Sequence, residues 1–415
     1  MFQLIVILVI TFLSVSCCCA VNLEEIINKA IKNSLKLKYQ FHQYKNTKTQ
    51  LKLTNLTNFL PEINLKLNLD ENFNSNKIIT LNQKIIDWGN TLATFNKSNH
   101  LLNIEKIRFQ QLKQEVALNA VKTYVDVLYK IEILKLKKHK EYVSLENLLA
   151  IKKRSSLGEI TSTEVSLAKA RFLSAISERI DAEGKLKLAN ISYFHLIGEI
   201  PNKLPKINNK LPSIPNLNEC IKLAKTNNLS LKALIYQKKA AKMEMVTKLS
   251  KLLPSLNLNI STNLKSGNTQ SGNQLLPKKL LGNFNIIFTF NIPILKIGIN
   301  TIDINQAKIN IKKSTYDYYQ ITKNIEKEII NSWNNILTAK AVIKANYETE
   351  KAIISSLKRI KQEINLGLKN TIELLNIKEK LFKTRLNLIE AKGNYIINVY
   401  NLLFTINSNS TTSNK

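Results

Sequence analysis

The segment from Asn90 to Ser156 contains neither proline nor glycine, and most of its residues favour a helix. At 1.5 Å per residue, one helix over this segment would be roughly 100 Å long. A compact globular domain cannot hold such a helix, so its apolar side must be covered by other long helices. Because the whole chain has only 10 Gly and 8 Pro, a turn-rich all-β fold and a Gly-rich nucleotide-binding fold are also disfavoured.

Two further segments carry mostly apolar residues at alternating steps of three and four, which is the heptad pattern of a coiled coil. The first set is Val165, Ala168, Phe172, Ala175, Arg179, Ala182, Leu186, Ala189 and Tyr193. The second set is Leu374, Ile377, Leu381, Thr384, Leu388, Ala391, Tyr395, Asn398 and Leu402. A sustained period of 3.5 residues predicts left-handed supercoiling around a partner helix.

The two heptad segments belong to two copies of one unit, each predicted as helix, two strands, long helix and helix. Gly298 follows Gly89 by 209 positions, and Gly367 follows Gly158 by the same 209 positions. The separation between matching residues of the two copies changes mainly between the two strands of a copy, where loop insertions are best tolerated. The expected divisions are a signal peptide at 1–20, a first repeat at 21–198, a proline-rich linker at 199–216, a second repeat at 217–406 and a disordered tail at 407–415.

Four runs alternate apolar and polar residues with a period of two, and we predict strands over 62–70, 79–85, 255–264 and 283–292. Runs of about ten residues fit a tilted strand that crosses a membrane. A half-buried hairpin of a soluble protein has the same alternation, but the absence of a globular core favours the membrane. Four strands cannot close on themselves, so a membrane β-barrel would need several chains. The sequence is compatible with totals of eight, twelve or sixteen strands.

The N-terminus predicts export. Residues 1–20 carry no charge, are apolar over 4–15, and end in three cysteines and Ala20, which suits signal-peptide cleavage before Val21. The missing Lys or Arg near Met1 is a departure, and cleavage before a cysteine, giving a lipoprotein, is the alternative. The mature chain would keep only Cys220, so neither a disulfide nor a cysteine metal site is expected within it.

Composition and motifs weigh against two classes of function. The chain has 61 Lys+Arg against 30 Asp+Glu, a net charge of +31, but the lysines are spread evenly, as on solvated helix faces, so no nucleic-acid partner is expected. Its four histidines show no metal-ligand spacing, and no nucleophile elbow or phosphate loop occurs. We therefore expect that the chain is not an enzyme and that it has no catalytic residue, cofactor or metal. An exported coiled-coil surface protein without a channel is the remaining alternative.

The order of these features resembles the TolC-like outer-membrane efflux proteins over essentially the whole mature chain. The motifs are Leu60-Pro61 and Leu253-Pro254 before the first and third strands, Trp88-Gly89 after the second strand, and the turns Leu157-Gly158 and Leu366-Gly367, followed by Glu164 and Glu373. The resemblance implies a mainly α fold with a membrane β-barrel, in which three chains form a twelve-stranded barrel and long antiparallel coiled-coil helices form a tunnel across the periplasm.

The resemblance also implies a function and its partners. The chain would be an outer-membrane channel-tunnel for efflux or type I secretion in a Gram-negative-type bacterium, surrounded by outer-membrane lipid. As a passive homotrimeric duct it would work with a periplasmic adaptor protein and an inner-membrane transporter. The cargo is not implied.

The resemblance further implies which residues form the periplasmic entrance. Family members commonly have two acidic residues three apart there, and the matching positions are Glu373 and Asn376, of which Asn376 departs from the pattern. Lys369 lies where the family often has an arginine that holds the entrance closed, and Glu164 is the counterpart in the first repeat. An ordinary solvated helical pair of Lys369 and Glu373, four residues apart, is the alternative. The turns at Leu157, Gly158, Leu366 and Gly367 resemble tips that dock the adaptor.

Overall fold

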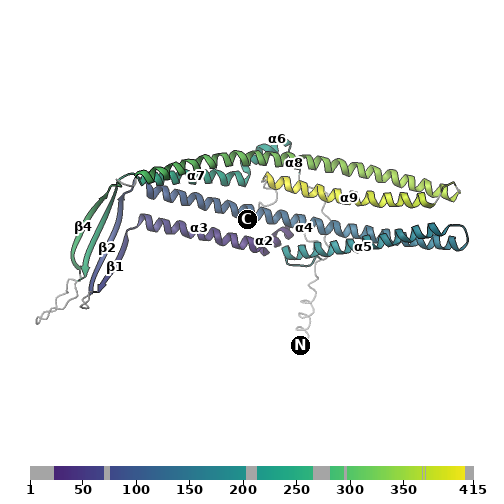
Figure 1. Cartoon of the computed structure of the whole chain (residues 1–415), viewed down its shortest axis with the longest axis horizontal. Helices are drawn as coiled ribbons and strands as arrows, with labels where there is room; N and C mark the ends of the chain where they lie inside the picture. The colour runs from purple at the N-terminus through teal and green to yellow at the C-terminus, as the bar shows by residue number, and fades with distance from the viewer. Residues whose placement is uncertain are drawn as a thin grey trace, which may run out of the picture. The chain divides into compact units, whose positions relative to one another are not determined.

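The computed structural model describes residues 23–69, 75–201, 213–264, 281–293, 297–366, 368–369 and 371–406. The expected signal peptide at 1–20, most of the linker at 199–216, the tail at 407–415 and Gly367 lie outside the described residues. In Figure 1 the same order of elements occurs twice. The first series is α2 (Leu23–Asn33), α3 (Leu35–Phe59), β1 (Glu62–Leu69), β2 (Ser75–Ile86), α4 (Asn90–Ser156) and α5 (Ser162–Ile197). The second is α6 (Leu217–Asn227), α7 (Leu229–Ser250), β3 (Ser255–Leu264), β4 (Leu281–Asn291), α8 (Ile297–Asn365) and α9 (Thr371–Thr405).

The helices form two compact units, and each unit takes elements from both halves of the sequence. One unit gathers the described parts of 1–35, 113–226 and 326–415, and the other gathers those of 36–112 and 227–325. The long helices α4 and α8, of 67 and 69 residues, contribute to both. None of the helices within the described ranges has a stretch both long and apolar enough to cross a membrane.

The second unit contains a four-stranded antiparallel sheet with the order β1-β2-β3-β4. Pairing of β2 with β3 joins a hairpin from each half of the chain. Because apolar and polar residues alternate along the strands, the sheet has one apolar and one polar face. One row across the apolar face is Ile63, Leu81, Ile260 and Ile286. The neighbouring row on the polar face is Asn64, Thr80, Ser261 and Asn285. The apolar face is uncovered, because Ile63 is 66% exposed and Ile286 is 58% exposed.

Two local differences from the predicted elements have physical causes. Strand β2 begins at Ser75, four residues before the predicted start at Ile79, because β1 pairs with it as far as Ser75 although that stretch does not alternate. The expected first helix of each series is two helices, which meet at Ser34 and at Asn228. The Asn228 side chain accepts hydrogen bonds from the backbone N–H groups of Ser230 and Leu231, so it caps α7.

Alanines at every seventh position form the buried seam of α5. Ala168, Ala175, Ala182 and Ala189 are all buried, and Ala175 is 0% exposed. They belong to the predicted heptad set, and Ala168 packs with Leu148 and Ile151 of α4. Small side chains at this spacing allow two helices to approach closely over several turns.

We expect Ala175→Leu to destabilise this helix pair by about 1–3 kcal/mol, because the added methyl groups must displace a tightly packed neighbour. Thermal unfolding of the detergent-solubilised protein, followed by circular dichroism, would measure the loss. Ala170→Leu is the matched control, since Ala170 lies on the same helix and is exposed. Equal melting temperatures for the two variants would show that the seam is not tightly packed.

Candidate functional site

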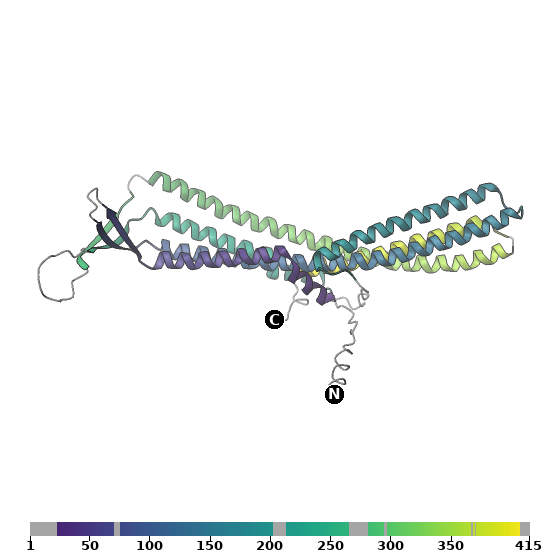
Figure 2. The ribbon, with the colours of Figure 1, turned by 90° about the horizontal axis from the view of Figure 1, so that it is seen from below.

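The first unit carries two helix-to-helix turns, between α4 and α5 and between α8 and α9, which lie at the same end of that unit in Figures 1 and 2. In the α4–α5 turn, the N–H of Glu159 bonds to the carbonyl of Arg154 at 3.1 Å, and the N–H of Gly158 bonds to that of Ser155 at 3.0 Å. This pair of bonds defines a Schellman motif, which needs a left-handed residue, and Gly158 supplies it with φ +76°. The Arg154 and Glu159 side chains then form an ion pair of 2.9 Å across the turn.

The α8–α9 turn repeats this plan with the charges exchanged. The N–H of Leu368 bonds to the carbonyl of Glu363 at 2.8 Å, and these two residues are 209 positions after Glu159 and Arg154. The acidic residue now ends the first helix, and its basic partner is Lys369, at 3.4 Å. An ion pair between side chains therefore spans each of the two turns.

Lys369 also reaches forward into α9. Its Nζ lies 3.1 Å from a carboxylate oxygen of Glu373, so one ammonium joins an acid at the end of α8 to an acid in the first turn of α9. We call Glu363, Lys369 and Glu373 the entrance clasp, after the role that the family resemblance predicts for Lys369 and Glu373. The hydrogen bond to Glu373, and next the one to Glu363, raise the pKa of Lys369, so it stays charged at neutral pH. The structure thus brings two of the predicted residues together and adds Glu363, which sequence reasoning missed.

The other predicted residues have different surroundings. Asn376 accepts a hydrogen bond of 3.1 Å from the guanidinium of Arg171, which ties α9 to α5. The backbone N–H of Glu164 bonds to the Thr161 hydroxyl, so Glu164 belongs to the N-terminal cap of α5. Leu157 and Leu366 point into solvent, with 67% and 73% of their surfaces exposed. Leu368, which the sequence did not suggest, is equally exposed at 72%.

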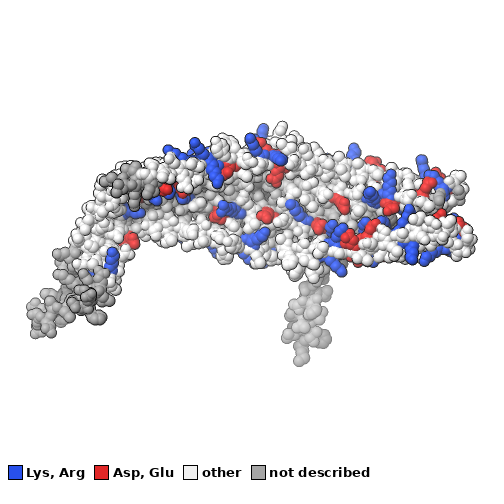
Figure 3. All heavy atoms as spheres, viewed as in Figure 1, with Lys and Arg blue, Asp and Glu red and all other residues white. Residues whose placement is uncertain are grey.

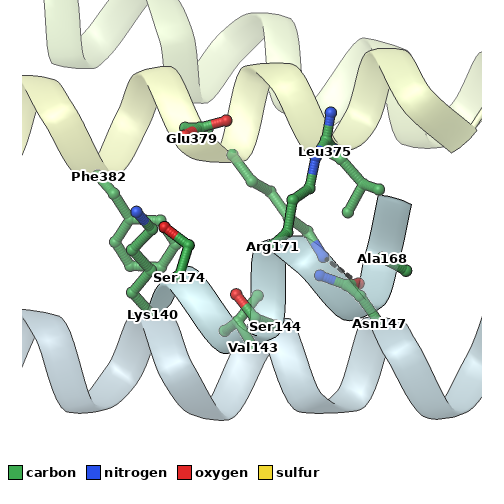
Figure 4. A pocket seen from close by; sticks show the side chains of 11 residues that line it. Lys140, Val143, Ser144, Asn147, Ala168, Arg171, Ser174, Leu375, Glu379 and Phe382 are labelled. Carbon is green, nitrogen blue, oxygen red and sulfur yellow. Dashed lines mark hydrogen bonds between the residues drawn. The ribbon is translucent and has the colours of Figure 1, made fainter. Parts of the chain in front are cut away.

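A groove lies behind these turns, between the α4–α5 pair and α9 (Figure 4). Its walls are Lys140, Val143, Ser144 and Asn147 from α4, Ala168, Arg171 and Ser174 from α5, and Leu375, Lys378, Glu379 and Phe382 from α9. The half-buried Lys378 donates a hydrogen bond of 3.1 Å to the Asn147 side chain, drawn dashed in Figure 4. Burial, and then the charge of Lys361, lower the pKa of Lys378.

The α4–α5 side of the groove is fixed by ion pairs. Glu178 of α5 accepts hydrogen bonds of 2.7 Å from both Lys137 and Lys140 of α4. Burial alone would raise the pKa of Glu178, but the two lysines outweigh it and the pKa is lowered. Arg179, a predicted heptad residue, is half-buried and pairs with Glu141 and Glu183, which explains how a charge is tolerated at the seam.

The site therefore combines exposed apolar tips with a charged clasp at the α8–α9 turn. No group of three or more His, Cys, Asp or Glu residues in the described parts of the chain is placed to hold a metal ion. Charges of both signs are mixed over the helices on the face seen in Figure 3, and they form no large basic patch there.

Comparisons with known proteins agree with this picture. Residues 220–408 match the sequence model of a family described as outer membrane efflux protein. The chain is 24% identical to the outer membrane efflux protein BepC of Brucella suis over 78% of this chain and 70% of BepC. It is 22% identical to the outer membrane protein TolC of Escherichia coli K12, over 78% of this chain and 67% of TolC. The solved CmeC outer membrane channel of Campylobacter jejuni superposes with a TM-score of 0.81 at 16% identity, covering 92% of this chain and 85% of CmeC.

The fold is therefore that of an outer-membrane channel protein. The partial family match and the relatives make the chain similar to the TolC-like outer-membrane efflux proteins. An outer-membrane location with the helical part in the periplasm follows from this similarity. This family consists of transport channels. The resemblance seen in the sequence and the expected fold class are confirmed.

Proposed function

We propose that three copies of the chain form a passive exit duct in the outer membrane for efflux or type I secretion, without catalysing a reaction. One observation carries the proposal: the four-stranded sheet exposes an apolar face, on which Phe284, Phe288 and Phe290 are each at least 60% exposed. Such a face is stable when lipid covers it. Strands β1 and β4 each pair on one side only among the described strands, and edges within lipid must be paired. Sheets from neighbouring copies would provide that pairing and close around a lumen.

The proposed partners are a periplasmic adaptor and an inner-membrane transporter, as the family resemblance implies. The two turns support adaptor docking because Leu157, Leu366 and Leu368 form exposed apolar tips on charged helices. The groove in Figure 4 begins beside Leu375, near the same turns, and its walls present both lysine and apolar side chains. Gly367, which would complete the second tip, lies outside the described residues.

Fractionation and native mass measurement test the proposed function together. The protein should be found in the outer-membrane fraction, require detergent for extraction, and have the mass of a trimer in native mass spectrometry. Reconstitution in a planar bilayer should then give discrete conductance steps. Extraction without detergent, together with a mass that is not a multiple of three chains, would instead support a coiled-coil surface protein.

A further inference from the structure

The polar face of the sheet has a simple chemical composition. Along the described strands it carries asparagine, serine and threonine at most positions, including Asn64, Asn82, Asn257, Asn259, Ser261, Asn285 and Thr289. Its charged residues in these strands are Glu62, Lys66 and Lys84, a net charge of +1 per chain. The strands' third lysine, Lys77, pairs with Leu67 and therefore lies on the apolar face.

The two lysines of the polar face stand at different heights along the strands. Lys66 lies opposite Ile78 of β2, and Lys84 lies six residues further along that strand, roughly 20 Å away. Both side chains are exposed, and neither forms an ion pair with another residue of the described segments. Their charges are therefore available to ions that pass along this face.

Lys84 also lines a large hollow where the sheet meets the helices. Asn257 and Asn291 of the polar face line the same hollow, together with Lys251 and the acids Asp87 and Asp303. Both acids are engaged: Asp87 accepts hydrogen bonds from the backbone N–H groups of Gly89 and Thr91, and Asp303 pairs with Lys248 at 2.8 Å. The hydrogen bond from Lys248 is the main cause of the lowered pKa of Asp303. Lys84 has no such partner among the described residues, whereas the charge of Lys251 also helps to lower the pKa of Asp303.

We propose that the sheet-lined part of the duct selects for anions, with Lys66 and Lys84 as the residues that determine this selectivity. The inference rests on the proposed function, because it requires the polar face to line a lumen. Every copy would add one Lys66 and one Lys84, so each position becomes a ring of like charge. Rings of charged side chains set ion selectivity in pores. The favoured cargo would be small polar molecules of net negative charge.

The expected size of the effect follows from Coulomb's law and salt screening. Three lysines about 10 Å from the axis of a water-filled pore should change the anion-to-cation permeability ratio by at least about twofold at 0.1 M salt. At 0.01 M salt the Debye length is about three times longer, so the change should grow to about fourfold or more. A selectivity that rises as salt falls is therefore part of the prediction.

Reversal potentials in planar bilayers under a potassium chloride gradient test the proposal on the full-length assembled protein. The chloride-to-potassium permeability ratio of the unmodified channel is the reference value. Lys66→Asn and Lys84→Asn should each lower this ratio, and the double variant should lower it most, because the polar face then carries only Glu62. Asparagine matches the neighbouring residues of that face, so folding should not change. Lys77→Asn is the matched control on the apolar face and should leave the ratio unchanged.

The outcomes separate the two claims. If all four variants conduct with the same anion-to-cation permeability ratio as the unmodified channel, the selectivity inference is overturned. The proposed duct then stays in place. A ratio that responds to Lys77→Asn as strongly as to Lys66→Asn would also overturn it, because the two faces would then be equivalent. A trimer that inserts without any conductance would overturn the proposed function and the inference with it.

Discussion

Replacing Phe288 by arginine should sharply reduce the amount of channel that assembles in the outer membrane. Phe288 is 64% exposed and lies on the apolar face of β4, opposite Leu258. A charged side chain facing lipid near the middle of the membrane costs about 2–4 kcal/mol. That is roughly 30-fold to 1000-fold in an equilibrium constant, so most of the protein should fail to insert. Quantifying the trimer in isolated outer membranes would measure the effect.

Asn285→Arg is the matched control for this prediction. Asn285 lies three residues away on the same strand but on the polar face, in the row of Ser261 and Thr80. Arginine there would face water, so assembly should be close to normal. If the two variants assemble equally well, the apolar face does not contact lipid.

Much of the fold could be predicted because its patterns are local and long. Strand β3 has the predicted bounds, Ser255–Leu264, since its alternation continues to both ends. Helix α4 covers the predicted segment Asn90–Ser156, which contains no residue that would interrupt a helix. The start of β2 could not be predicted, because residues Ser75 to Ile78 become strand only through pairing with β1. The cap at Asn228 was visible in the sequence as an asparagine before an apolar run, and it was missed.

The site was less accessible to sequence reasoning than the fold. Lys369 and Glu373 could be paired because they are four residues apart on one turn of helix. The hydrogen bonds from Arg171 to Asn376 and from Lys378 to Asn147 join residues 205 and 231 positions apart. No local pattern encodes such contacts, because they depend on how α9 packs beside α4 and α5. The periplasmic roles of the clasp and the tips therefore stay predictions.

We expect the entrance clasp to hold the periplasmic end of the duct closed. Lys369 contacts Glu363 at the end of α8 and Glu373 in α9, so it restrains the hairpin that these helices form. Lys369→Ala would leave both acids without this partner and bring two uncompensated negative charges together. The hairpin should then open more readily, and single-channel conductance in a planar bilayer should rise several-fold. Lys185→Ala is the matched control, since Lys185 makes an exposed pair with Asp181 at the same i,i+4 spacing on α5. It should leave conductance unchanged.

Glu373→Ala tests the acidic side of the same clasp. If three copies bring their Glu373 carboxylates around one axis, these like charges repel one another and attract cations. Divalent cations added from the periplasmic side should therefore block the unmodified channel, and Glu373→Ala should remove the block. Asn376 cannot add a second ring of charge, because it is neutral and its oxygen accepts a hydrogen bond from Arg171. Arg171→Ala would remove this link between α5 and α9 but no charge from the ring of Glu373 carboxylates. It should therefore affect conductance more than cation block. Unchanged conductance in Lys369→Ala and unchanged block in Glu373→Ala would together show that the clasp is an ordinary surface ion pair and that the entrance is closed elsewhere.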